Sequence, residues 1–117
     1  YGGGGYSHED GRMTLSELEA IIQSRANTSV EDSWTAKLLS KGPEKVAEKF
    51  GEEAIECLIE AVRGDRERLT YEAADVLFHL MVMLHARGVS INAVLAELGR
   101  RQSKSGLAEK ASRPTQD

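Results

Sequence analysis

Two pairs of acidic residues stand at matching distances on either side of one short turn signal, Gly64-Asp65. Glu56 lies eight residues before Gly64, and Glu72 lies eight after it. Glu53 lies eleven residues before Gly64, and Asp75 lies eleven after it. If both flanks are helices that fold back on each other at Gly64, the four carboxylates meet at two matching levels, because a helix rises about 1.5 Å per residue and packed axes lie about 8–10 Å apart. The pattern predicts a helical hairpin lined with acids.

Such a group of acids, with no base between its members, would repel itself. It therefore favours a hard divalent cation with oxygen ligands, Mg²⁺ or Mn²⁺ before zinc. An enzyme that acts on phosphates is the first hypothesis. The predicted metal ligands are Glu53, Glu56, Glu72 and Asp75.

Capping signals and helical periodicity predict an all-α fold of four to five helices. Thr14 and Glu17 form a capping-box pattern, Pro43 suits the first position of a long helix, and Gly88 suits a helix stop. Ser33 and Ser90 are expected N-caps. The expected helices run to 26 from the Thr14 cap, over 34–40 and 43–63, over about 66–87, and from the Ser90 cap to about 101.

The helix expected over 66–87 carries apolar residues around nearly its whole circumference, so we expect it to be central and buried. Four helices cover only part of such a helix. A second copy of the chain should cover the rest, in a two-fold helical bundle. The preceding helix, 43–63, is expected to pack one apolar face and to expose an opposite stripe. The apolar face comprises Val46, Phe50, Ala54, Cys57, Leu58, Ala61 and Val62, and the exposed stripe Lys45, Lys49, Glu52, Glu56 and Glu60.

Composition limits the class of protein. With 117 residues and 40% hydrophobic content, the chain fits one domain. A net charge of −4 argues against nucleic-acid binding. No apolar run reaches the roughly 18 residues of a membrane span, and no secretory signal is recognisable. The single cysteine, Cys57, is compatible with the cytoplasm and is expected to pack as a small hydrophobe.

The expected domain comprises residues 13–102. Residues 1–12, which begin with a Gly-rich run, are expected to be a disordered expression leader, with Met13 as the native start. Residues 103–117 are expected to form a basic, partly flexible tail.

Structural roles remain open for several of these residues. Taken alone, Glu53 and Glu56 fit a solvated surface. Glu72 and Asp75 lie where the helix becomes apolar, and no Lys or Arg occurs in the eleven residues that follow, so they need a partner. That partner is a shared metal or a lysine, Lys45 or Lys49, that reaches across. His79 fits a satisfied core histidine, and His85 a structural or exposed position.

Longer motifs around the acids carry a resemblance. Residues 52–56 (EEAIE) and 72–75 (EAAD) resemble the EExxE…ExxD signature of all-α, MazG-like nucleoside triphosphate pyrophosphohydrolases. Residues 33–39 (SWTAKLL), 41–43 (KGP), 49–54 (KFGEEA), 71–80 (YEAADVLFHL) and 87–90 (RGVS) closely resemble the phosphoribosyl-ATP pyrophosphohydrolase family of histidine biosynthesis. The likeness runs from about Met13 to Arg113.

This resemblance implies Mg²⁺-dependent hydrolysis of 1-(5-phosphoribosyl)-ATP to 1-(5-phosphoribosyl)-AMP and pyrophosphate, by a homodimer. The predicted metal ligands then form the catalytic centre together with Glu52, which is expected to hold or deprotonate the attacking water unless it is a plain surface residue. Lys45 and Lys49 would meet phosphate oxygens. The segment with Thr35, Lys37 and Lys41 would bind the nucleotide or phosphoribosyl end. Trp34 is expected to pack rather than stack on a base.

Two roles are open for the basic tail. It either closes over the second phosphate-bearing arm of the substrate or stays solvated and disordered. Counted together with the end of the preceding helix, its cations are Arg100, Arg101, Lys104, Lys110 and Arg113.

Two rival functions share parts of this pattern. A house-cleaning pyrophosphohydrolase for ordinary or modified dNTPs would use the same acids without the phosphoribosyl-binding segments. A non-catalytic helical dimerisation module would explain the apolar helix and would bind no divalent metal.

Overall fold

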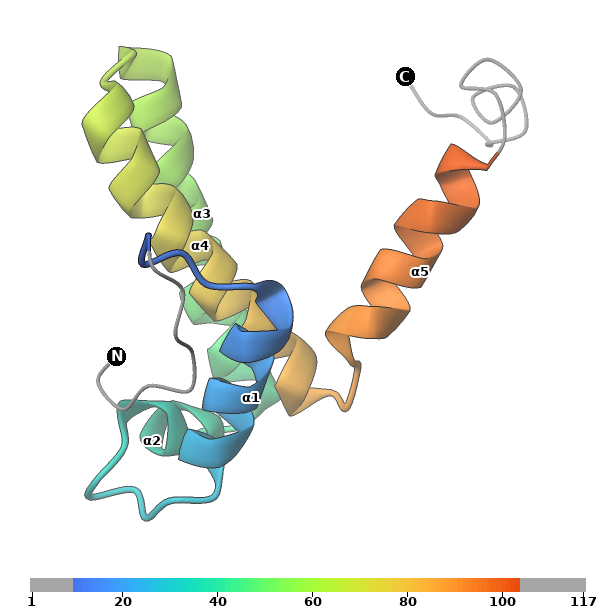
Figure 1. The fold of residues 1–117 in the computed structure, drawn as a ribbon. Coiled ribbons are helices and arrows are strands. Elements are labelled where there is room, and N and C mark those ends of the chain that lie inside the picture. Colours follow the sequence, from blue (N-terminus) through green and yellow to red (C-terminus); the bar gives the residue numbers. More distant parts are fainter. Residues whose placement is uncertain (1–9, 104–117) are drawn as a thin grey trace.

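The structure, a computed structural model, describes residues 10–103, and within that range its regular elements are all α-helices (Figure 1). They are α1 (Leu15–Ala26), α2 (Trp34–Ser40), α3 (Pro43–Arg63), α4 (Arg66–Ala86) and α5 (Ile91–Gln102). The all-α prediction is confirmed, and the expected boundaries agree to within one residue. Most of the predicted leader and tail, residues 1–9 and 104–117, lie outside the described residues.

The predicted caps explain where the helices begin and end. The Thr14 hydroxyl accepts from the Glu17 backbone N–H at 3.1 Å, and the Glu17 carboxylate accepts from the Thr14 N–H at 2.7 Å. At the hairpin turn, Gly64 has a φ of +82°, a left-handed conformation that costs least for glycine. The Asp65 carboxylate then accepts from the Arg68 N–H at 3.0 Å and caps α4.

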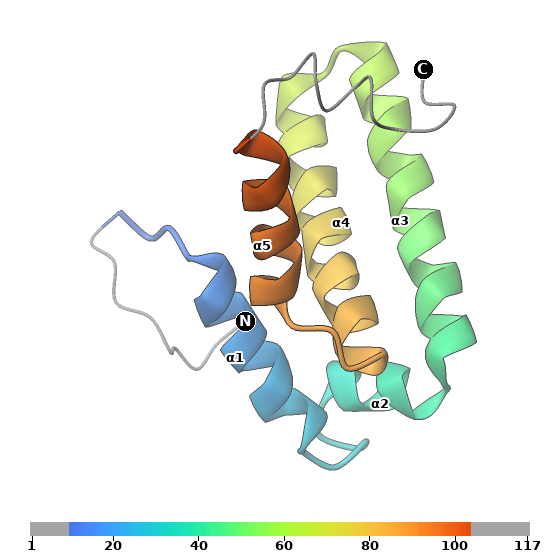
Figure 2. The same ribbon diagram turned by 90° about the vertical axis from the view of Figure 1, so that its right-hand side faces the viewer.

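The long helices α3 and α4 form an antiparallel hairpin, and α1 and α2 pack at the end opposite its turn (Figures 1 and 2). The hydrophobic core lies there, between α1, α2 and this base of the hairpin. Its buried members are Leu18, Ile22, Leu38, Val46, Phe78, Met81, Val82 and Ile91.

Closer to the turn, apolar side chains of the hairpin remain exposed. On α3, Leu58 is 54% exposed and Val62 is 83% exposed, while Leu77 on α4 is 40% exposed. The prediction that the apolar face of α3 packs along its whole length is therefore wrong for a single chain. The partial exposure of α4 agrees with the expectation that one chain covers only part of this helix. Its burial against a second copy stays a prediction. Cys57, expected to be buried, is only partly so.

The last described helix, α5, packs against α1 and diverges from the hairpin (Figure 1). Its axis makes an angle of 107° with that of α4 across the break. In residues 10–103 no single helix is long and apolar enough to cross a membrane, and only the bent pair of α4 and α5 meets the length and composition criteria jointly.

Candidate active site

Three of the four predicted metal ligands converge between α3 and α4. One carboxylate oxygen each from Glu53, Glu56 and Glu72 lies within 4.8 Å of the other two. Glu53 and Glu72 are buried, and Glu56 is exposed. Glu56 and Glu72 meet because they lie equally far from Gly64 on helices that run back along each other, and Glu53 joins them from one turn earlier on α3. We call these three residues the acid cluster.

The electrostatics of the acid cluster favour a bound cation. Burial raises the pKa of the Glu72 carboxyl above its usual range, and the charges of Glu56 and Asp75 raise it further. Arg68 acts in the opposite direction. In addition, Oε1 of Glu72 is buried and accepts no hydrogen bond from the described residues. A positive charge beside Glu72 would relieve both the repulsion and the unmet hydrogen-bonding capacity.

Lys49 lies beside the acid cluster, next to Glu53. Its Nζ lies 3.2 Å from Oε2 of Glu53 and 3.9 Å from Oε1 of Glu52. The hydrogen bond to Glu53 raises the pKa of Lys49, and the charges of Glu53, Glu52 and Glu56 add to this against the effect of burial. Lys49 is thus ionised and held at the edge of the cluster by residues of its own helix.

Arg68 supplies the partner of Glu72 that the sequence did not reveal. It lies one turn before Glu72, with Nη2 at 3.7 Å from Oε2 of that residue. Lys45 makes its ion pair with Glu48 on its own helix, so neither it nor Lys49 provides the expected reach across the hairpin. Basic residues before the acids, and not only after them, were the signal that could have identified this pair.

Glu60 corrects a second expectation. It was placed on the exposed stripe of α3, but it is buried, and its Oε1 accepts no hydrogen bond from the described residues. Two guanidinium groups approach it: Nε of Arg63 at 4.0 Å and Nε of Arg68 at 3.9 Å. A polar layer with arginines at its rim therefore continues from the acid cluster towards the turn.

The fourth predicted ligand, Asp75, lies outside the group within 4.8 Å and lines a neighbouring cavity of about 600 Å³. Thr35, a predicted substrate-binding residue, lines the same cavity and is almost fully buried. Further lining residues are Arg25, Thr28, Asp32, Ser33, Trp34, Phe78 and His79. We call this space the Asp75 cavity. His79 lies beside Asp75 because it follows one turn later on α4, as the spacing indicates, whereas the approach of Arg25 from α1 was not predictable from the sequence.

Lys37 and Lys41 line a separate, open cavity of about 650 Å³. Trp34 contributes to both cavities and is 51% exposed, so the expected packing role is wrong for this chain. Glu52 is exposed on α3, beside the acid cluster. Among the predicted substrate contacts, Thr35, Lys37 and Lys41 thus divide between two adjoining cavities, while Lys45 and Lys49 line neither of them.

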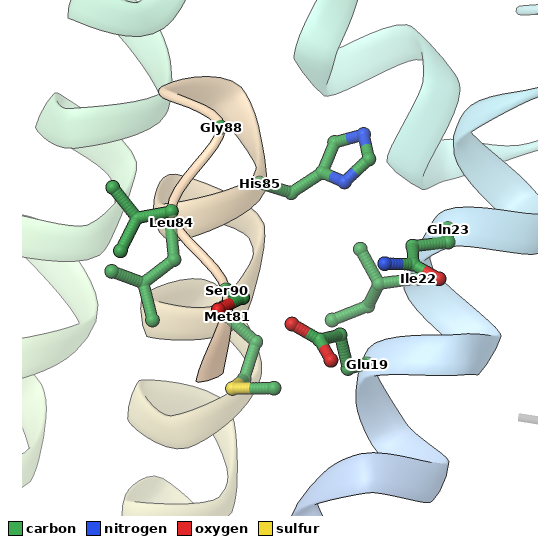
Figure 3. Close-up of a pocket in the computed structure, with 9 residues that line it drawn as sticks. Glu19, Ile22, Gln23, Met81, Leu84, His85, Gly88 and Ser90 are labelled. Carbon is green, nitrogen blue, oxygen red and sulfur yellow. The ribbon is translucent and has the colours of Figure 1, made fainter. Parts of the chain in front are cut away.

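A third cavity, of about 300 Å³, lies between α1 and the end of α4 (Figure 3). Oε2 of Glu19 accepts a hydrogen bond from the Ile91 N–H at 2.8 Å. This carboxylate lies at the positive end of α5 and fixes where that helix starts. His85, expected to be structural or exposed, is exposed and lines this cavity, away from the acid cluster.

Comparison with known proteins gives a consistent result. A family model described as phosphoribosyl-ATP pyrophosphohydrolase matches residues 15–102. A relative from Dinoroseobacter shibae, named phosphoribosyl-ATP pyrophosphatase, is 65% identical over 99 residues, which cover 85% of this chain and 97% of the relative. Relatives of the same name from Ruegeria pomeroyi and Rhodobacter capsulatus are 62% identical over 100 residues and 63% identical over 99. These alignments cover 86% and 85% of this chain, and 95% and 96% of the two relatives.

Proposed function

Because the chain belongs to the phosphoribosyl-ATP pyrophosphohydrolase family, we propose that it hydrolyses 1-(5-phosphoribosyl)-ATP to 1-(5-phosphoribosyl)-AMP and pyrophosphate. This is the second step of histidine biosynthesis, for which we propose a cytoplasmic location. The observation that carries the proposal in the structure is the convergence of Glu53, Glu56 and Glu72 between two helices.

A divalent cation fits the acid cluster on geometry and on chemistry. Ligand oxygens around Mg²⁺ lie about 2.0–2.1 Å from the ion, and opposite ligands are therefore about 4.2 Å apart. Among three ligands only one pair can be opposite, and the other pairs are about 2.9 Å apart. The three oxygens, which lie within 4.8 Å of one another, would therefore draw closer together around the ion. The donors are carboxylate oxygens, which suit Mg²⁺, with Mn²⁺ as a substitute. We propose Asp75, one turn beyond Glu72, as the fourth ligand.

When bound, the cation would neutralise charge on the leaving pyrophosphate and make a water molecule more acidic. The residues of the chain supply the rest. Glu52 would orient or deprotonate the attacking water from the exposed face of α3. Lys49 would exchange part of its contact with Glu53 for a phosphate oxygen, since it is ionised and half-buried beside the cluster. Lys45, exposed one turn earlier, would reach the outer phosphate.

The second phosphate-bearing arm needs a cationic contact away from the metal site. Lys37 and Lys41 line an open cavity, and we propose that they bind the ribose phosphate there. Thr35 would hydrogen-bond the nucleotide from the neighbouring cavity. The basic tail is a further candidate, and its part beyond residue 103 lies outside the described residues.

We also propose that the working form is a homodimer. Exposed apolar residues lie along one face of α3 towards the hairpin turn, and others lie on α4 and on the diverging helix α5. They comprise Ile55, Leu58, Ile59, Val62, Leu77, Leu95 and Leu98. A second copy of the chain is the simplest cover for these residues, because two bundles related by two-fold symmetry can pack the same apolar surface against each other.

A substrate panel with and without Mg²⁺ tests the proposal. We expect Mg²⁺-dependent pyrophosphate release from phosphoribosyl-ATP, abolished by EDTA and restored by added Mg²⁺. The kcat/KM should be far higher than for ATP or dNTPs, because binding of the remote phosphate helps to position the reacting one. If ATP or a dNTP is the better substrate, the pathway assignment fails and the house-cleaning alternative takes its place.

A further inference from the structure

His79 is a buried polar residue that the proposed mechanism does not use. It is 7% exposed, and its Nδ1 lies 2.7 Å from the backbone carbonyl oxygen of Asp75. Because a carbonyl oxygen only accepts, Nδ1 carries the hydrogen. The other ring nitrogen, Nε2, is buried and has no hydrogen-bond partner among residues 10–103. A buried polar atom without a partner costs free energy. Because His79 is also one of the residues that line a cavity, a group bound in that cavity is a candidate partner for Nε2.

His79 is one of the residues that line the Asp75 cavity, together with Asp75 itself. Along α4, Glu72 belongs to the acid cluster, Asp75 follows three residues later, and His79 follows four residues after that. At about 1.5 Å per residue, these positions span about 10 Å of one helix. A nucleotide whose phosphates lie at the acid cluster therefore has room to extend its sugar and base past Asp75 towards His79.

The chemistry of this cavity suits the nucleoside part better than a phosphate. Its charged lining residues are two carboxylates, Asp32 and Asp75, against one guanidinium, Arg25. This excess of negative charge disfavours a second phosphate and favours hydroxyl and amino donors. The exposed indole of Trp34 offers an apolar face for a base.

We propose that Nε2 of His79 accepts a hydrogen bond from a hydroxyl or amino group of the nucleoside part of the substrate. His79 is then a substrate-binding residue that fixes how the nucleotide extends from the acid cluster. The inference rests on the proposed function, because it takes the position of the phosphates from it. With its hydrogen on Nδ1 and donated to the Asp75 carbonyl, an imidazole ring has Nε2 available as an acceptor.

Two substitutions separate this role from a structural one. His79→Asn keeps an amide hydrogen near the position of Nδ1 and removes Nε2. His79→Gln places a polar group near the position of Nε2 and gives up the Nδ1 contact. The matched control is His85→Asn, on the exposed side of the same helix and in the other cavity. Thermal melting followed by circular dichroism reports whether each variant is folded.

Kinetics with phosphoribosyl-ATP, with AMP and inorganic pyrophosphate as competing inhibitors, give the readout. In His79→Asn we expect KM and the inhibition constant of AMP to rise about three- to tenfold, the loss of one hydrogen bond. Inhibition by pyrophosphate should not change, because pyrophosphate binds at the acid cluster. His79→Gln should recover part of the AMP affinity, and His85→Asn should match the wild type.

The opposite ranking overturns the inference. If His79 only supports the helix, His79→Asn will be native-like in KM and AMP inhibition, and His79→Gln will lower the melting temperature without a change specific to AMP. An equal loss of AMP and pyrophosphate inhibition would also overturn it, since it would indicate damage to the whole site. A wild-type protein inactive on phosphoribosyl-ATP is a different result, because that refutes the proposed function.

Discussion

The two halves of the α3–α4 hairpin differ in what covers them. Near its base, Val46, Phe78 and Val82 are buried against α1 and α2. Towards the turn the interior becomes acidic, with Glu53, Glu60 and Glu72 buried, while Leu58, Val62 and Leu77 are exposed on the outside. The base has a core of its own. In the turn half, charged groups are buried between the two helices and the apolar residues lie on the surface.

This difference indicates how stability and chemistry are divided in the molecule. The packed base holds the two helices in register, so that acids eleven and eight residues before the turn face one eight residues after it. The turn half is free to bury repelling carboxylates because α1 and α2 stabilise the hairpin elsewhere. We infer that this half is completed from outside, by a cation within and a second chain on the apolar face.

The largest effect is expected from breaking the acidic half alone. Asp75→Asn and Glu56→Gln each remove a ligand charge and little volume. We expect kcat to fall at least about 10²–10³-fold, as for the loss of one group that stabilises the transition state, with unchanged helix content by circular dichroism. Glu44→Gln, on an exposed acid at the base end of α3, serves as the control. Full activity in both variants would refute the site.

The next effect concerns the exposed apolar face. Leu58→Glu places a charge on it and should raise the dimer dissociation constant at least about thirtyfold, the equivalent of a 2 kcal/mol hot spot. Sedimentation or light scattering at micromolar concentration measures the change. Ala20→Glu, exposed on α1, should leave the dimer intact. A wild-type protein that is a stable monomer at that concentration would contradict the dimer.

A smaller effect is expected on stability in the absence of metal, because the buried acids of the turn half then destabilise the folded state. The pKa of Glu72 is raised in the folded state, chiefly by burial, so the folded protein holds that proton more tightly than the unfolded chain. The free energy of unfolding therefore falls as pH rises from the ordinary pKa to the raised one. Above the raised pKa the ionised, buried Glu72 keeps the folded state less stable. In EDTA at neutral pH, Glu72→Gln should melt at a higher temperature than the wild type, with a difference that shrinks in acid. A lower melting temperature would contradict this.

The smallest effect is expected on α5, away from both halves of the hairpin. Hydrogen bonds from Arg100 and Arg101 lower the pKa of Glu97 to about 2. Their stabilisation is present above the ordinary pKa and is lost as pH falls towards about 2. The group is exposed to solvent, so Glu97→Gln should change the melting temperature only slightly, less so at high salt, and leave turnover unchanged. A large drop in melting temperature would indicate that α5 carries more of the fold than its packing suggests.

Local signals made the helices predictable. The capping box at Thr14, the proline at the start of α3 and the glycine at the hairpin turn act within a few residues, so sequence spacing is enough to locate them. The acid cluster was predictable for a similar reason. Equal counts from a single turn bring Glu56 and Glu72 to the same level across two helices, although the equal counts of Glu53 and Asp75 did not bring Asp75 into the cluster.

The sequence does not show which helix surfaces are covered by other parts of the molecule, because this depends on tertiary structure. The periodicity of α3 shows that Leu58 and Val62 share an apolar face, but not whether anything packs on it. Glu60 was assigned to an exposed stripe from its charge, and only the approach of α4 buries it. The free Nε2 of His79 likewise depends on which atoms surround the ring in the folded chain.

The most direct test of the central claim is Mn²⁺ binding measured by electron paramagnetic resonance, in the wild type and in Glu72→Gln. If Glu53, Glu56 and Glu72 form a divalent-cation site, the wild type will bind Mn²⁺ saturably, Mg²⁺ will displace it, and Glu72→Gln will weaken binding at least about tenfold. Unchanged Mn²⁺ affinity in Glu72→Gln, or no saturable binding by the wild type, would contradict a metal site at the acid cluster.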